Sequence, residues 1–216
     1  FNVSNSNNAL FSVQPTIDVA TGNLSFTPAA NANGVAVVSV SLSDDGGTAN
    51  GGVDASATQD FTITVNSVND APSFSTGANV TVNEDSGSYD AAFATGISDG
   101  DPEVAQTLTF NVSNSNNALF SVQPTIDLVT GNLSFTPVAN ANGVAVVSVS
   151  LSDDGGTANG GVDASATQDF TITVNSVNDA PTFSTGANVT VNEDSGSYNA
   201  TFATGINDGD PEVAQT

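Results

Sequence analysis

The sequence predicts an all-β chain made of tandem β-sandwiches, and three observations lead to this fold class. Short runs alternate apolar and polar side chains with a period of two residues, which is typical of half-buried strands. Phe1–Phe11 returns unchanged as Phe110–Phe120, an offset of 109 residues, and only seven mismatches separate 1–107 from 110–216. A period of this length matches a whole small domain rather than a solenoid repeat. No segment shows convincing helical periodicity.

The repeat boundary is predicted at Val68–Pro72 and again at Val177–Pro181, where a proline stops a strand-like run. Residues 1–72 are then the C-terminal part of one repeat, 73–181 a complete repeat, and 182–216 the N-terminal part of the next. We expect the native chain to continue in both directions. We also expect that neither partial repeat folds alone, and that segments equivalent to 182–216, from another chain or from a preceding stretch, complete 1–72.

Within 73–181 the strands are predicted from the alternation of apolar and polar side chains, and each strand ends at Gly, Asn, Asp or Pro. A further segment, Tyr89–Ile97, is predicted as one more strand. About seven strands in one period are typical of an immunoglobulin-like sandwich. The six clearest runs are 79–82, 107–112, 119–122, 133–136, 144–151 and 170–174.

The composition excludes several classes of function. The chain has no Lys, Arg, His or Cys and carries 23 acidic residues, a formal charge of −23. It therefore offers no basic surface for nucleic acid or anionic lipid, and no imidazole or thiolate for a catalytic triad, redox chemistry or a zinc site. We expect no nucleic-acid partner, no membrane insertion and no enzymatic activity. Val, Leu, Ile and Phe are frequent enough to build a core, so we expect folded domains.

The acidic residues gather in the predicted loops. Three carboxylates alternate in Asp99–Glu103, a spacing that lets them converge on one hard cation, and the loop is copied as Asp208–Glu212. Carboxylates brought together without a cation repel one another, so calcium is the natural counter-ion. An alternative is that these are ordinary polar loops of an acidic, soluble protein. The candidate metal ligands are Asn69, Asp70, Glu84, Asp85, Asp99, Asp101, Glu103, Asp153, Asp154, Asn178, Asp179, Glu193, Asp208, Asp210 and Asp44.

The motifs resemble the cadherin-like and bacterial immunoglobulin-like repeats of large surface adhesins. Val68–Pro72, read V-N-D-A-P, is similar to the N-D-x-A-P boundary of cadherins. Asp99–Asp101 is similar to their D-x-D motif, and Val149–Asp153 to their V-x-A-x-D strand end. The acidic L-D-R-E loop of cadherins is replaced by Ala139–Gly143, which favours one or two ions per junction over three.

This resemblance implies an extracellular, cell-surface protein with calcium at each domain junction. The implied ligands at the first junction are Asn69 and Asp70 with Asp99, Asp101 and Asp153. At the second junction Glu84 would act with Asn178, Asp179, Asp208 and Asp210.

The sequence leaves three functions open. The first is a structural extender repeat of a calcium-dependent bacterial adhesin or extracellular filament, whose partners are neighbouring repeats and other copies of the protein. The second is a repeat that itself binds a glycan or a neighbouring cell surface. The third, a glycosidase-like use of Glu84 and Glu103, requires a cleft with a carboxyl group of raised pKa, for which the sequence has no signature.

Overall fold

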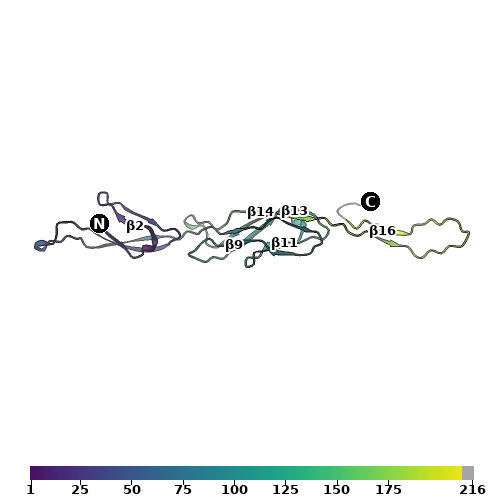
Figure 1. The fold of residues 1–216 in the computed structure, drawn as a ribbon, viewed down its shortest axis with the longest axis horizontal. Coiled ribbons are helices and arrows are strands. Elements are labelled where there is room, and N and C mark those ends of the chain that lie inside the picture. The colour runs from purple at the N-terminus through teal and green to yellow at the C-terminus, as the bar shows by residue number, and fades with distance from the viewer. Residues whose placement is uncertain (211–216) are drawn as a thin grey trace. The chain divides into compact units, whose positions relative to one another are not determined.

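The computed structural model describes residues 1–210, and its strands are drawn in Figure 1. The chain divides into two compact units. The first unit comprises Phe1–Ser73 with the loops Ser98–Leu108 and Ser152–Ser165. The second unit comprises Phe74–Ile97, Thr109–Leu151 and the chain from Ala166 onward. The repeat boundaries at 72/73 and 181/182 stay predictions. No helix in the described part of the chain has the length and apolar character needed to cross a membrane.

Two main sheets, with seven strands between them in residues 73–181, build the second unit. One sheet has the order β10-β13-β14-β7 and the other the order β11-β12-β8. β14 pairs antiparallel with β13 and parallel with β7, whereas β12 pairs antiparallel with both β11 and β8. This confirms the predicted all-β sandwich. The strands are β7 (Val80–Asn83), β8 (Tyr89–Ala92), β10 (Thr109–Asn114), β11 (Phe120–Ile126), β12 (Asn132–Pro137), β13 (Gly143–Ser152) and β14 (Gln168–Asn175).

The core of the second unit is formed by alternate side chains of these strands. Leu133 and Phe135 of β12, Val147 of β13 and Ile172 of β14 are all buried. Burial of one such side chain contributes about 1.5–3 kcal/mol relative to leaving it in water. The apolar residues that recur at every second position of the sequence are therefore the residues that fill the core.

The prediction of a single strand over Tyr89–Ile97 is wrong. The segment forms β8 and then β9 (Thr95–Ser98), which pairs with β6 (Ser73–Ser75) instead of β12. The break falls at Phe93 and Ala94, whose amides both donate to the Gly131 carbonyl at 3.1 and 2.8 Å. This bifurcated contact ends the pairing with β12 and lets the chain change sheets. β6 was missed because three residues are too few to show alternation.

The first unit contains the same repeat with fewer strands. Within residues 1–72, β1-β4-β5 form one sheet and β2-β3 another. Leu10, Phe11, Ala36, Val38 and Ile63 make its buried core. The strands are β1 (Asn2–Asn5), β2 (Phe11–Ile17), β3 (Leu24–Pro28), β4 (Gly34–Ser41) and β5 (Gln59–Val65).

Toward the C-terminus, β15 (Thr182–Thr185) pairs with β16 (Ala203–Asn207). The described residues 186–202 between them contain no strand. The helical content of residues 1–210 is limited to four 3-10 turns, η1 (Asn8–Leu10), η2 (Ala49–Gly51), η3 (Asn117–Leu119) and η4 (Ala158–Gly160).

Candidate functional site at the linker

Asn69 of the predicted linker is an anchor inside the first unit, with only 7% of its surface exposed. Its side-chain amide donates to Asp153 Oδ1 at 3.0 Å and to the Val162 carbonyl at 2.7 Å. Its backbone carbonyl accepts from the Val162 amide at 3.0 Å, and its side-chain oxygen accepts from Gln106 Nε2. One uncharged side chain thereby ties the linker to two loops that are far apart in sequence.

Three glycines lie so close to the linker that a side chain at any of them would crowd it. A Cβ on Gly155 would overlap the Asn69 side chain, and one on Gly161 would lie 3.0 Å from Asn69 Cβ. Gly100, at φ +83°, faces the Ala71 carbonyl so closely that a Cβ would overlap it. Larger residues at these positions would displace the linker, so the glycines of both loops fix its path.

Asp99 and Asp101 lie in the loop Ser98–Leu108, and both carboxylates accept hydrogen bonds from amide groups of that loop. Asp101 is buried; its Oδ1 accepts from the amides of Glu103 and Val104 at 3.0 and 3.3 Å. Gln106 Nε2 donates to Asp101 Oδ2 at 3.0 Å, and the Gln106 amide donates to Asp99 Oδ2 at 3.1 Å. These bonds fix the orientation of the two carboxylates within the loop.

Negative charge is concentrated around Glu103. A hydrogen bond between the two carboxyl groups lowers the pKa of Asp101 and raises that of Glu103, and the charges of Asp101 and Asp70 raise the pKa of Glu103 further. Asp70 and Glu103 also line one hollow of about 200 Å³ together with Asn31. The chain thus brings these carboxyl groups together without any side-chain cation of its own.

Asp153 and Asp154 belong to the second loop around the linker. Asp153 Oδ1 also accepts from the Gly155 amide at 3.0 Å. Asp153 Oδ2 and Gln106 Oε1 are buried and have no hydrogen-bond donor in the described residues. Asp154 Oδ1 accepts from the Thr107 amide at 2.7 Å, and this bond lowers its pKa. Two buried oxygens beside the linker are therefore left as unused acceptors.

Glu84 lies beside the second predicted linker, in the second unit. Only 2% of its surface is exposed. Its amide donates to the Asn175 carbonyl at 3.0 Å, and its Oε1 accepts from the Val177 amide. Its Oε2 is buried and has no donor among residues 1–210. In this linker Asn178 Nδ2 donates to the Asp179 carbonyl at 3.1 Å, Asp208 is half-buried and Asp210 is buried.

Not every candidate ligand lies at a linker. Asp44 is exposed and accepts from its own loop at Gly46, Glu193 is exposed, and Asp85 accepts from the Asn140 amide at 3.3 Å. Glu212 lies outside the described residues. Among residues 1–210 no group of three or more carboxylates is arranged to hold a metal ion, and the ligand set stays a prediction.

Gln106 and Val162 contact the linker, and the sequence analysis did not predict either of them. Gln106 contacts Asn69, Asp99 and Asp101, and Val162 pairs with Asn69 through its backbone. A backbone group leaves no signature in a sequence. Gln106 could have been noticed only as an amide side chain three residues beyond Glu103.

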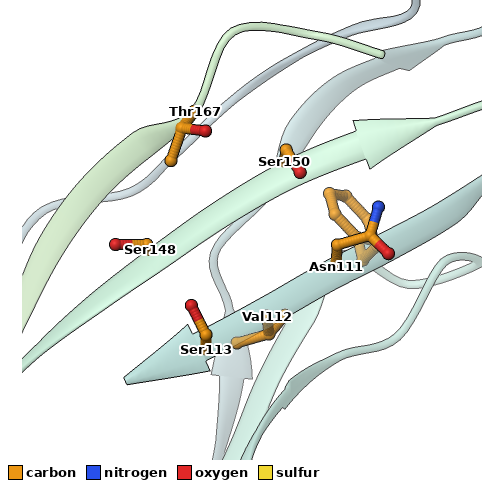
Figure 2. A pocket seen from close by; sticks show the side chains of 7 residues that line it. Asn111, Val112, Ser113, Ser148, Ser150 and Thr167 are labelled. Atoms are coloured by element: carbon orange, nitrogen blue, oxygen red, sulfur yellow. The ribbon is translucent and has the colours of Figure 1, made fainter. Parts of the chain in front are cut away.

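A separate groove of about 510 Å³ lies on the second unit. Figure 2 shows Asn111 and Ser113 on β10 next to Ser148 and Ser150 of β13, with Thr167 ahead of β14. Hydroxyl and amide groups line it, and no carboxylate is among its lining residues. This groove is therefore distinct in chemistry from the linker loops.

No protein-family model matches the sequence, and no curated protein matches it either. Among solved structures, mouse protocadherin-24 EC1-3 is similar at 16% identity and a TM-score of 0.43, over 81% of this chain. The chain spans 57% of that protocadherin chain. Domains 4 and 5 of the S-layer protein SbsC are similar at 15% identity and a TM-score of 0.29, over 80% of this chain and 68% of that one. None of these similarities assigns the chain to a family.

Proposed function

We propose that this chain is a structural extender repeat of an extracellular adhesin or filament, and that calcium bound beside its linkers fixes each joint between repeats. The proposed ligands are oxygen atoms of Asp70, Asp99, Asp101 and Asp153 at one linker, with Glu84, Asp179, Asp208 and Asp210 at the next. Calcium accepts six to eight oxygens, including amide and backbone carbonyl oxygens. A site of this kind need not consist of carboxylates alone.

The burial of Glu84 is the observation that carries this proposal. A carboxylate removed from water is costly unless donors or a cation accompany it. Glu84 has one amide donor, its second oxygen is buried without a donor in the described residues, and the chain contains no Lys, Arg or His. An external cation is the partner that this carboxylate lacks. Its hydrogen bond from the Val177 amide supports a cation site beside the second linker.

The residues of the first linker would act as a clamp. Asn69 holds the linker against the loops that carry Asp101 and Asp153. Calcium, when bound, supplies positive charge that draws those carboxylates toward Asp70. The joint would then be stiff in calcium and loose without it, because a short linker alone leaves neighbouring domains free to move.

Thermal unfolding in chelator and in millimolar calcium tests the proposal. Binding to the folded state alone stabilises it by RT ln(1 + [L]/Kd), about 2.7 kcal/mol at a hundred times Kd. We expect a clear rise in melting temperature with calcium and a much smaller one with magnesium, which demands tight octahedral geometry. Glu84→Gln, which keeps the shape of the side chain, should reduce the rise. Identical melting curves at matched ionic strength would refute calcium binding.

A second candidate is that the repeat binds a glycan, and the hydroxyl-lined groove on β10 and β13 favours it. Ser113, Ser148 and Ser150 offer hydrogen bonds of the kind that sugar hydroxyls accept and donate. Screening the chain against a glycan array in calcium separates the two candidates. Binding that Ser148→Ala with Ser150→Ala abolishes would support recognition of a glycan, whereas an array without binding leaves the extender function.

A further inference from the structure

Asn159 and Gly160 form an exposed pair in the loop Ser152–Ser165 of the first unit. Both residues have positive φ, +57° and +90°. The Gly161 amide donates to the Ala158 carbonyl at 3.0 Å and closes a turn around the pair. Glycine has no side chain to block the approach of its backbone nitrogen to the preceding side chain. The loop therefore presents a chemically reactive pair to water.

The reaction open to this pair is deamidation, for which asparagine is a labile residue. The Gly160 backbone nitrogen attacks Asn159 Cγ and forms a new N–C bond. The amide proton passes through water to the side-chain NH2 group, which leaves as ammonia. Water then opens the cyclic imide at either of its two carbonyls and gives aspartate or isoaspartate. Water is the only other reactant, so the chain can carry out this reaction without an enzyme.

The other asparagine–glycine pairs differ in how far their backbone is fixed. In Asn142–Gly143 the glycine begins β13 and is paired with Val174, and in Asn33–Gly34 the glycine begins β4 and is paired with Val65. Sheet pairing restrains the nitrogen that would have to attack. Asn50–Gly51 lies in a turn equivalent to that of Asn159, with φ +55° and +84°. The turns, and not the strand starts, are therefore the reactive places.

Asn159 differs from an ordinary surface asparagine because its turn contacts the linker segment. Its Nδ2 donates to the Ser67 carbonyl at 3.2 Å. Val162, three residues later, accepts from Asn69 Nδ2 and donates its amide to the Asn69 carbonyl. Deamidation replaces the NH2 donor by a carboxylate oxygen, which cannot donate to a carbonyl. Isoaspartate also adds a carbon to the backbone of the turn. Either product therefore loses the contact with Ser67.

We propose that Asn159 is a site of spontaneous deamidation, and that this modification weakens the hold of its loop on the linker. Each event adds one negative charge to a loop that already carries Asp153 and Asp154. It also leaves the Ser67 carbonyl without its side-chain donor. The contacts of the linker would then change with the age of the protein. The reaction requires no cation, so this inference is independent of the calcium function proposed above.

Mass spectrometry of the 216-residue chain, incubated in chelator at mildly alkaline pH, tests the reaction. A protease that cleaves before aspartate releases residues 154–162, in which Asn159 is the only asparagine. Residues 45–53 have the same sequence, so the chain carries Asn50→Gly to make the fragment unique. Isoaspartate should leave the fragment intact with OH in place of NH2, and aspartate should create a new cleavage point. The synthetic peptide 154–162 is the reference. A folded chain that is unchanged when this peptide has reacted overturns the proposal.

The melting temperature in chelator tests the effect on the linker. Asn159→Asp supplies the aspartate product directly and should lower the melting temperature. Asn50→Asp is the matched control, because it adds the same charge to the equivalent turn, where no hydrogen bond from the Asn50 side chain is present among residues 1–210. We expect this control to melt like the unmodified chain. Equal melting temperatures of the two variants would show that the Ser67 contact does not hold the linker, and would reject its weakening by deamidation.

Discussion

The two copies of the repeat have nearly the same sequence, yet equivalent side chains are buried to different extents. The difference depends on which strands lie over them. Leu133 and Leu24 sit at equivalent positions of β12 and β3, yet one is fully buried and the other is 40% exposed. The local geometry hardly changes, since the pairings of β4 with β5 and of β13 with β14 share one register. Pairing between neighbouring strands is thus set locally, whereas burial depends on strands supplied from elsewhere.

The largest expected difference is between Leu133→Ala and Leu24→Ala. Truncation of a buried leucine costs about 2–5 kcal/mol, because a cavity adds to the lost transfer energy. Leu24 is already partly in water, so its truncation should cost well under half as much. Hydrogen exchange read separately over β11-β12 and β2-β3 measures both. Val122→Ala and Val13→Ala change two equally exposed positions and are the controls. Equal losses of stability in Leu133→Ala and Leu24→Ala would show that β3 is covered in solution.

The next difference concerns Gly131→Ala and Gly22→Ala. Both positions have positive φ, which costs a non-glycine residue about 1–2 kcal/mol. Only Gly131 also faces a carbonyl, so its substitution should cost more than the strain alone. Urea unfolding, followed by hydrogen exchange of the same strands, gives the two losses. If both variants lose the same stability at low concentration, the space at Gly22 is not open.

A smaller difference is expected between Gly155→Ala and Gly46→Ala in the equivalent loops. A Cβ on Gly155 would displace the Asn69 side chain, whereas one on Gly46 would meet only Asp44 Oδ1, at 3.1 Å. We expect Gly155→Ala to lower the melting temperature and to weaken stabilisation by calcium. Gly46→Ala should change neither. Melting curves with and without calcium measure this, and a wild-type response of Gly155→Ala would mean that Asn69 does not hold the site together.

The smallest difference, close to zero, is expected at Asp18 and Asp127. The hydroxyl and amide of Thr21 lower the pKa of Asp18, and the amide and hydroxyl of Thr130 lower that of Asp127. A lowered folded-state pKa stabilises the fold above the unfolded pKa of about 3.9, and the contribution is lost as pH falls through the folded value. Thr21→Ala and Thr130→Ala should raise the two pKa values equally. Carboxyl NMR titration checks this, and unequal shifts would show that the turn depends on its neighbours.

The same contrast explains what the sequence could predict. Alternation along β12, β13 and β14 identified the core, because burial on one face of a strand follows a two-residue period. It could not separate β8 from β9, since the break between them is caused by the Gly131 carbonyl, nearly forty residues away along the chain. The parallel pairing of β7 with β14 is likewise a long-range choice without a local pattern.

The candidate site was predictable in residue type and not in contacts. The linker asparagine and the alternating carboxylates were visible because oxygen-rich loops favour a hard cation. That Asn69 binds the Val162 backbone, and that Gln106 binds Asn69 and Asp101, depends on how two loops fold around the linker. In the sequence Gly155 and Gly161 look like ordinary loop residues. Only the packing of the Asn69 side chain against them shows why they must be small.

Small-angle scattering is the most direct measurement of the central claim, that calcium fixes the joint at Asn69 and Asp70. We expect a rigid profile in calcium, a flexible one in chelator, and the flexible one in calcium once Asp99→Ala and Asp101→Ala are added. Rigidity that survives both chelator and the added pair of substitutions would show that packing alone holds the joint, and would contradict the calcium function.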